Sequence, residues 1–264
     1  MDLIHQLTPK LKQLRLSGIL ETLELRNRAA VEGHLSYVEF LTQLVEDEVE
    51  RRGHQKLKMR LRRAAFDPAK TIETFDFSAT PRLNRQDVLD LATCRFVERR
   101  QNVFLVGPAG VGKSHLAQAL GHEACRRGYD AVFLTASRAL SLLQAGRADG
   151  SYDRRLAALV RADLLILDDF GLKAVQPPGA EDLYEIIAGR YEKGSIIVTS
   201  NRAFAEWTDV FAEPLLASAA LDRLAHDAHQ IVLTGESYRT RATRRRTHEK
   251  RQGGTQENDA DAAA

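Results

Sequence analysis

The chain has 264 residues, of which 44% are hydrophobic and 28% charged, and a formal net charge of +2. This length suits one large domain, or a domain with a small accessory one, and the composition excludes a wholly disordered or fibrous chain. No apolar run reaches the roughly 18 residues of a membrane helix, and the N-terminus lacks the pattern of a secretory signal. We therefore expect a cytoplasmic protein without a membrane partner.

The first 66 residues predict a small all-α N-terminal domain, because apolar residues recur there at spacings of three and four. Thr8 and Pro9 are typical of the start of a helix, in which Ser17-Gly18 introduces a kink. A capping-box pattern at Ser36 and Glu39 predicts the start of a second helix. One face of this second helix is expected to carry Phe40, Leu41, Leu44 and Val45.

A basic run at positions 51–63 contains seven cations and no acidic residue. The cations are Arg51, Arg52, Lys56, Lys58, Arg60, Arg62 and Arg63. If the second helix continues past Gly53 instead of breaking there, several of them stack along one side of it. The run predicts salt-dependent, largely sequence-independent contact with duplex DNA. A solvated helix face, partly neutralised by the acidic residues at 46–50, stays open as the alternative.

The rest of the chain predicts a linker, an α/β domain and a tail. Residues 67–85 are rich in Pro, Ser and Thr, which favours a linker. In residues 86–238, short apolar runs alternate with helical stretches, which predicts a parallel sheet with helices on both faces. The expected strands are Val103–Val106, Ala131–Leu134, Leu164–Leu167, Ile196–Thr199 and Ile231–Leu233. Residues 239–264 are basic and then acidic, and lack large apolar residues, so we expect a disordered tail.

The strongest motif is the sequence GPAGVGKS at residues 107–114, which fits G-x-x-x-x-G-K-[ST] between an expected strand and an expected helix. The backbone N–H groups of such a loop, and the positive end of the following helix, bind phosphates. Lys113 is expected to reach the β- and γ-phosphates of ATP, and Ser114 to bind Mg²⁺. The predicted nucleotide-binding residues are Gly107, Pro108, Ala109, Gly110, Val111, Gly112, Lys113, Ser114 and His115. A glycine-rich turn without function is the alternative.

Polar residues follow two later strands and complete the expected ATPase site. Asp168 and Asp169 directly follow an apolar strand, which is the Walker B pattern. Asp168 is expected to orient the Mg²⁺, and Asp169 to act as general base on the attacking water. Asn201 follows the next strand, where its amide could hold that water or contact the γ-phosphate. Ordinary strand-end turns are the alternative for both positions.

These motifs resemble the IstB-like ATP-binding proteins of bacterial insertion sequences, from about residue 8 to residue 239. The runs that carry the resemblance are GPAGVGKSHLAQALG, LLILDDFG, GRYEKGSIIVTSNRAF and ALDRLAHDAHQIVLTGESYR. The resemblance implies a P-loop AAA+ ATPase of the ASCE type, related to the DnaC helicase loaders. It implies a protein that uses ATP and Mg²⁺, self-associates into a ring or filament on duplex DNA, and assists a cognate transposase.

The resemblance also suggests Arg223 as an arginine finger that reaches the ATP site of a neighbouring subunit. The alternative is an ion pair between Arg223 and Asp222 or Glu213 within one chain. Because Asp169 is shorter than the glutamate of many AAA+ enzymes, we expect slow hydrolysis, stimulated by DNA and by oligomerisation. A DnaC-like helicase loader and a non-hydrolysing ATP switch or scaffold remain open as other functions.

Overall fold

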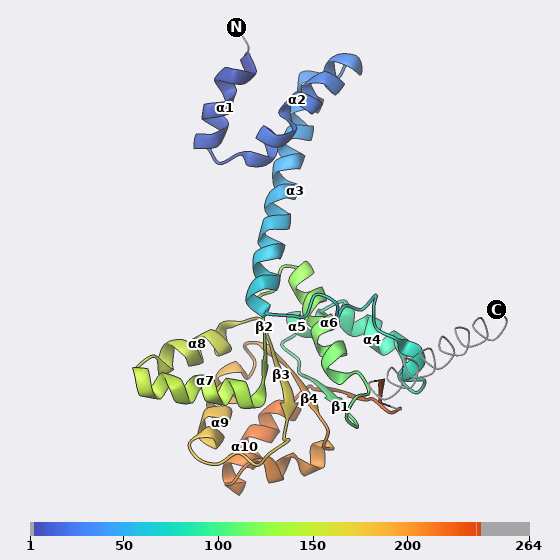
Figure 1. Ribbon diagram of the computed structural model, residues 1–264. Helices are drawn as coiled ribbons and strands as arrows, with labels where there is room; N and C mark the ends of the chain where they lie inside the picture. Colours follow the sequence, from blue (N-terminus) through green and yellow to red (C-terminus); the bar gives the residue numbers. More distant parts are fainter. Residues whose placement is uncertain (1–2, 236, 239–264) are drawn as a thin grey trace, which may run out of the picture. The chain divides into compact units, whose positions relative to one another are not determined.

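The fold is known from a computed structural model, which describes residues 3–235 and 237–238. The chain divides into an N-terminal unit, Met1–Arg60, and a second unit, Leu61–Ala264 (Figure 1). The division lies between Arg60 and Leu61, whereas the sequence predicts that the first domain ends at residue 66. The expected tail, residues 239–264, lies outside the described residues. No helix among the described residues is long and apolar enough to cross a membrane.

The N-terminal unit consists of α1 (Leu3–Gln13), α2 (Ser17–Glu32) and most of α3 (Tyr37–Ala64). The expected helix start at Thr8 and Pro9 is wrong, because α1 begins at Leu3 and Pro9 lies inside it. The interruption near Ser17 is confirmed and is complete, since a new helix begins at that residue.

The start of α3 has the predicted capping box, in which Ser36 and Glu39 bond to each other through backbone and side chain. The helix then runs without a break through Gly53. The expected apolar face is wrong in part, because Leu44 is buried whereas Leu41 and Val45 are exposed. The pattern therefore located the helix correctly but not its buried side.

A five-stranded parallel sheet forms the centre of the second unit, in the order β2-β3-β4-β1-β5. Its strands are β1 (Val103–Val106), β2 (Ala131–Thr135), β3 (Leu164–Phe170), β4 (Ser195–Ser200) and β5 (His229–Val232). Every residue of β1 and β4 is buried, which agrees with the continuous apolar runs 103–106 and 196–198 within them. The predicted α/β class and parallel sheet are confirmed, with β5 beginning two residues before the expected Ile231.

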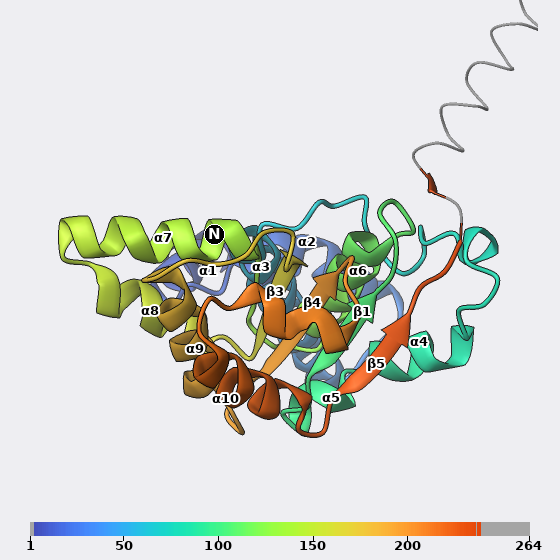
Figure 2. The same cartoon turned by 90° about the horizontal axis from the view of Figure 1, so that it is seen from below.

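Helices cover both faces of this sheet (Figure 2). The helices of the second unit are α4 (Arg85–Ala92), α5 (Arg95–Glu98), α6 (Lys113–Arg126), α7 (Ala136–Asp149), α8 (Tyr152–Arg161), α9 (Gly179–Arg190) and α10 (Pro214–Ala225). Short 3₁₀ turns occur at η1 (Phe77–Ala79) and η2 (Phe204–Val210). Alternate strand residues such as Leu165 and Leu167 pack with α7, α9 and α10, whereas Ile166 faces α6. The sheet thus holds the start of α6 at its carboxyl edge.

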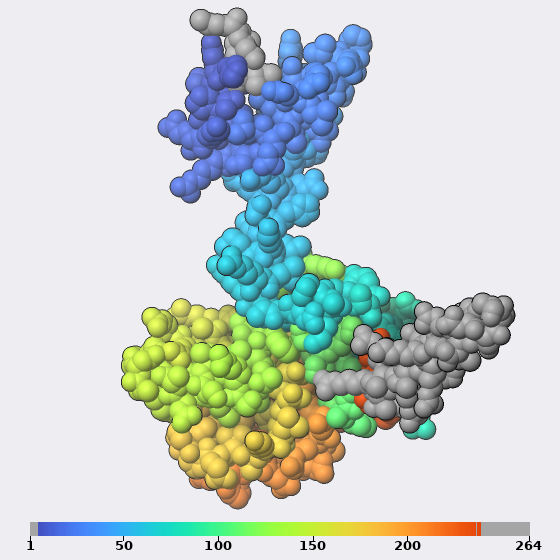
Figure 3. Space-filling model, viewed as in Figure 1, coloured from blue at the N-terminus to red at the C-terminus, as the bar shows by residue number. Residues whose placement is uncertain are grey.

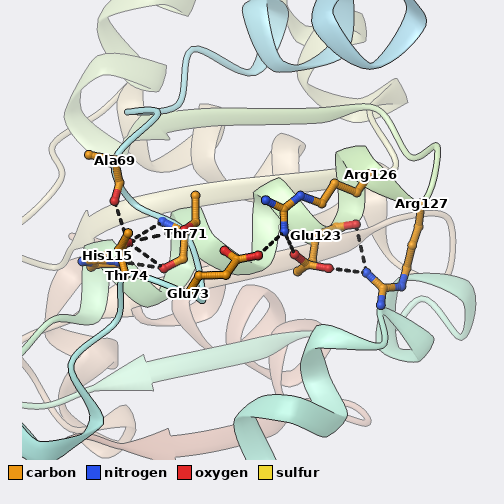
Figure 4. A network of polar contacts seen from close by, with 8 residues as sticks. All are labelled: Ala69, Thr71, Glu73, Thr74, His115, Glu123, Arg126 and Arg127. Atoms are coloured by element: carbon orange, nitrogen blue, oxygen red, sulfur yellow. Dashed lines mark hydrogen bonds and ion pairs between the residues drawn. The ribbon is translucent and has the colours of Figure 1, made fainter. Parts of the chain in front are cut away.

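Residues 67–75, which we call the strap, lie along α6 (Figure 4). The backbone N–H of Asp67 donates to Gln118 at 2.8 Å, and Glu73 pairs with Arg126 at 2.7 Å. In the space-filling view, the cyan strap and the green α6 lie side by side (Figure 3). Within the second unit, this stretch of the expected linker is therefore packed against α6, to which its residues hydrogen-bond.

Candidate functional site

The glycine-rich loop joins β1 to α6 at the carboxyl edge of the sheet. The N–H of Gly107 donates to Ser200 O at 3.1 Å, which fixes the loop against β4. A Cβ at Gly107 would lie 2.0 Å from Leu233 O, so the segment after β5 leaves no room for a side chain. Gly112 has φ +99° and directly precedes α6. These conformations let the loop curl around the N-terminus of a helix, where N–H groups are free to bind an anion.

Lys113 is the first residue of α6, and its side chain folds back over the loop. Its Nζ donates to the carbonyl oxygens of Gly107 and Pro108, both at 2.7 Å, and to Asn201 Oδ1 at 2.6 Å. Burial lowers the pKa of this ammonium, and the negative charges of Asp169 and Asp168 act against that shift. The contact with Asn201 joins the end of β4 to the loop that follows β1. The carboxylates at the end of β3 act on the same ammonium, so groups from the ends of three strands lie together here.

Asp168 is buried near the end of β3 and is held by the neighbouring strand. Thr199 Oγ1 donates to Asp168 Oδ1 at 2.5 Å and accepts the N–H of Asp169 at 3.0 Å. A single hydroxyl group on β4 therefore orients both members of the Asp-Asp pair. We did not predict a role for Thr199. The sequence did contain a signal for it, because Thr199 is the polar last residue of an expected apolar strand. That strand was expected to end at the same edge of the sheet as Asp168.

Asp169 differs from Asp168 in backbone conformation. Its φ is +55°, and the register between β3 and β4 shifts between Leu167 and Phe170. This irregularity turns the Asp169 side chain to an exposed position while Asp168 stays buried. Aspartate tolerates left-handed backbone better than most residues with a side chain. The two carboxylates of the pair thus occupy different environments, as a metal ligand and a base would require.

The oxygen donors at this edge suit a hard cation. Ser114 contributes a hydroxyl group in the first turn of α6, and Asp168 a carboxylate at the end of β3. Mg²⁺ prefers such oxygen ligands and usually binds through one or two protein groups together with substrate phosphates. The residue types therefore fit the predicted Mg²⁺ site.

His115 follows Ser114 but faces away from the loop toward the strap (Figure 4). Its Nε2 lies 3.1 Å from Thr71 O and 3.3 Å from Thr74 Oγ1, and its ring packs edge-on against Phe75. The His115 side chain therefore points to the strap, and nucleotide binding by this residue, through its backbone N–H in the first turn of α6, stays a prediction. One residue beyond the motif, the helix has turned its side chain to a different surface.

Arg223 lies near the end of α10, just before β5, and so at the amino edge of the sheet. Its Nη1 donates to Ala219 O at 2.7 Å, and its Cζ lies 5.5 Å from the Tyr184 ring centroid. Among the described residues it makes no ion pair, so the expected alternative with Asp222 or Glu213 is absent there. The glycine-rich loop at residues 107–114, which we call the P-loop, lies at the other edge of the same sheet. Arg223 is therefore separated from the loop residues of its own chain.

The cations of the basic run all lie on α3 but differ in their partners. Arg51 pairs with Glu21 at 3.0 Å, and Arg52 with Glu48 at 2.6 Å. Arg52 thus has a partner among the acidic residues 46–50, as the alternative expects, whereas Arg51 pairs outside that group. DNA contact by either residue stays a prediction. The exposed side chains that make no ion pair within the described part of the chain are those of Lys56, Lys58, Arg62 and Arg63.

Three features define the class of protein as the P-loop AAA+ ATP-binding proteins. They are the order of the strands, the glycine-rich loop between β1 and α6, and the Asp168 carboxylate near the end of β3. The family model described as IstB-like ATP binding protein matches residues 9–246. The chain belongs to this family.

Relatives and solved structures agree with this assignment. The chain is 44% identical over 238 residues to an ATP-binding protein in an insertion sequence of Mycobacterium tuberculosis, covering 90% of this chain and 95% of the relative. It is 37% identical to the ATP-binding protein of insertion sequence IS21 of Pseudomonas aeruginosa, covering 92% and 91%. The crystal structure of the DnaC helicase loader superimposes with a TM-score of 0.52 at 21% identity, covering 63% of this chain and 98% of that one. At this identity, the DnaC likeness shows the fold alone.

Proposed function

We propose that this protein is an ATPase that assembles on duplex DNA and assists the transposase of an insertion sequence. The observation that carries the ATPase part is the contact between Lys113 and Asn201, which lies beside Asp168 and Asp169. Lys113 and Asn201 contact the terminal phosphates, and Asp169 draws a proton from the attacking water. Ser114 and Asp168 would hold a Mg²⁺ ion, which would supply positive charge to the phosphate oxygens.

Hydrolysis is tested first with Lys113→Ala. Phosphate release is expected to fall at least about a hundredfold, because the lysine is a principal electrostatic ligand of the transferred phosphate. Asp169→Asn keeps the backbone conformation that Asn also tolerates, and it is expected to retain ATP binding while losing turnover. Equal phosphate release by wild type and Lys113→Ala, with ATP bound by both, would leave a non-hydrolysing switch as the function.

Turnover by this site is expected to be slow and to depend on self-association. The Asp169 carboxylate is one methylene shorter than a glutamate, and Arg223 lies too far from the loop of its own chain to contact that nucleotide. Turnover per chain should therefore rise with protein concentration and with added duplex DNA. A rate per chain that is constant across concentrations would argue against catalysis shared between subunits.

The DNA-binding part rests on the exposed cations of α3. Phosphate contacts make the binding constant fall steeply with salt, by about 0.9 log units per log unit of salt for each neutralised phosphate. Lys56→Gln combined with Lys58→Gln should therefore reduce the slope by about 2. The matched control removes the exposed Lys10 and Lys12 of α1 in the same unit and should leave the slope unchanged. Equal slopes for wild type and both double variants would contradict DNA contact at this position.

Assembly on duplex DNA tests whether the protein is a transposition helper or a helicase loader. The relatives described above are named for insertion sequences, which supports a transposition helper over a helicase loader. A helper is expected to form ATP-dependent, salt-sensitive assemblies on duplex DNA in the absence of any other protein. Indifference to duplex DNA, together with intact ATP turnover, would instead support a loader that grips another protein.

A further inference from the structure

The last residue of the strap, Phe75, lies against the P-loop. A Cβ added at Gly112 would lie 3.0 Å from Phe75 Cε2 and 3.5 Å from its Cζ, so the edge of the ring fills the space beside this glycine. Gly112 directly precedes α6 and has the left-handed φ of +99°. The Phe75 residue is only 8% exposed. Its ring therefore has almost no surface to offer a ligand.

Two other rings hold Phe75 in this position. The centroid of the His115 ring lies 5.4 Å from that of Phe75, with an interplanar angle of 84°. The centroid of the Phe77 ring lies 4.9 Å away, at an angle of 75°. Aromatic pairs favour such edge-on arrangements. His115 lies three residues after Gly112, and residues at this spacing share one face of a helix. Phe75 therefore packs along the first turn of α6.

Hydrogen bonds within the strap fix the backbone that carries Phe75 (Figure 4). The Thr74 hydroxyl group donates to Ala69 O at 2.6 Å and accepts the N–H of Thr71 at 3.1 Å. The contacts of the His115 ring with both threonines join this turn to α6. Phe75 is therefore carried by a closed turn that is itself fastened to the helix after the P-loop.

The conformational freedom of glycine makes this contact relevant to binding. Glycine adopts more backbone conformations than other residues, so an unsupported glycine loses more entropy when a loop closes on a ligand. A ring packed beside Gly112 excludes the conformations that would move the backbone into it. A binding segment that is already held in one conformation loses less entropy on binding, and its affinity is higher.

We propose that Phe75 is a positioning residue of the P-loop. By holding Gly112 in the conformation that starts α6, it raises the affinity of the loop for the phosphates of a nucleoside triphosphate. The inference rests on the proposed function, because it takes the P-loop as the phosphate site. It concerns binding, however, and so its test does not require that the protein hydrolyse ATP.

The chain offers a matched control in Phe66, directly before the strap. Phe66 packs against another glycine of the same helix, Gly121, at which an added Cβ would lie 2.3 Å from Phe66 Cζ. Its ring centroid also lies 5.0 Å from that of His122. Gly121 is inside α6, about 13 Å along the helix from Gly112 at 1.5 Å per residue. Both phenylalanines therefore pack on α6, but the glycine beside Phe66 lies outside the P-loop.

The test is calorimetric titration of two ligands, ATP and inorganic tripolyphosphate, each in the presence of Mg²⁺. Phe75→Ala should weaken both by the same factor, about tenfold, because the ring acts on the loop that receives the phosphates. Phe66→Ala should leave both affinities unchanged, although it also removes a ring from α6. Urea unfolding followed by Trp207 fluorescence checks that each variant is folded. Phe75→Leu, which keeps apolar bulk and disturbs packing less, should weaken both ligands by a smaller, equal factor.

Turnover adds a readout that a loss of packing alone would not produce. The KM for ATP should rise in Phe75→Ala at a nearly unchanged kcat, because the bound phosphates themselves hold the loop during the reaction. A fall in kcat at an unchanged KM would contradict a role in binding.

Three results of the titrations would overturn the proposal. Weaker binding of ATP at an unchanged affinity for tripolyphosphate would mean that Phe75 contacts the base and not the loop. The other two are unchanged affinities for both ligands in Phe75→Ala, and an equal loss in Phe66→Ala. Lys113→Ala separates this inference from the proposed function. If Lys113→Ala weakens binding and Phe75→Ala does not, the inference alone fails. If Lys113→Ala leaves both affinities unchanged, the P-loop is not the phosphate site and both fail.

Discussion

The two units of the chain are stabilised by different means. In the second unit, whole strands and the side chain of Trp207 are buried in a continuous apolar core. In the N-terminal unit, Leu23 and Leu44 are the buried large apolar side chains among the described residues, whereas Leu25, Val45 and Val49 are exposed. The first unit thus depends far more on polar contacts.

Those polar contacts join α2 to α3. The buried Glu48 accepts the N–H of Gly18 at 2.6 Å and so caps the start of α2. Asp47 accepts two hydrogen bonds from Arg26, at 2.7 and 2.9 Å. Apolar packing therefore stabilises the fold of the nucleotide-binding unit, whereas a few capping and ionic groups stabilise that of the helical one. Substitutions and pH should therefore affect the two units separately.

The largest expected effect comes from Arg190→Met in the second unit. The change leaves four carbonyl oxygens, two of them in fully buried hydrogen bonds, without their donor, and we expect a loss of about 3 kcal/mol or more of unfolding free energy. Trp207 is the single tryptophan of the chain, so its fluorescence in urea reports on this unit. An unchanged urea midpoint would show that apolar packing alone holds the unit together.

Gly18→Ala should have the next largest effect, and in the other unit. A Cβ at Gly18 would lie 2.7 Å from the Glu48 Cα, so the backbones of α2 and α3 must separate. We expect a loss of about 1 to 3 kcal/mol from this overpacking, measured by hydrogen exchange of the α2 amides. Gly53→Ala is the control, because no atom lies within 4 Å of its Cβ and alanine favours a helix by about 1 kcal/mol. Stabilisation of the unit by both variants would contradict close packing of α2 against α3 at Gly18.

Thr199→Val separates function from stability in the second unit. The substitution keeps the shape of the buried side chain but removes the hydroxyl group that holds Asp168 and Asp169. Unfolding free energy should change by about 1 kcal/mol, whereas phosphate release should fall about tenfold or more. Thr199→Ser keeps the hydroxyl group and should retain most of the turnover. Equal turnover by the valine and serine variants would remove Thr199 from the site.

The smallest effect is the acid response of the N-terminal unit. The hydrogen bonds from Arg26 lower the pKa of Asp47 from about 3.8 to about 2. A pKa lowered by folding adds stability that is complete above about pH 4 and is lost as the pH falls through about 2. Exchange of the α2 amides should therefore accelerate more across this window in wild type than in Asp47→Asn, in which only Glu48, whose pKa folding also lowers, still loses its contacts with α2. Glu24→Gln, on the exposed side of α2, should behave as wild type.

The sequence predicted the second unit better than the first, for physical reasons. Buried parallel strands produce continuous apolar runs, and the P-loop needs glycine and lysine at fixed spacing, so both leave local patterns. The helical unit buries few apolar side chains, so its pattern did not show which side of α3 is buried. Contacts made across the fold, such as that of His115 with the strap, depend on side-chain direction and leave no signal in one sequence.

The three hydrogen bonds of the Lys113 ammonium have a consequence for affinity. An ammonium group has three protons, and in this structure all three are donated to oxygens of the protein. An incoming triphosphate therefore has to displace existing partners, so the net affinity is a difference between two sets of bonds. Displacement of the third partner frees Asn201 Oδ1, so that occupancy of the loop changes the contacts at the end of β4.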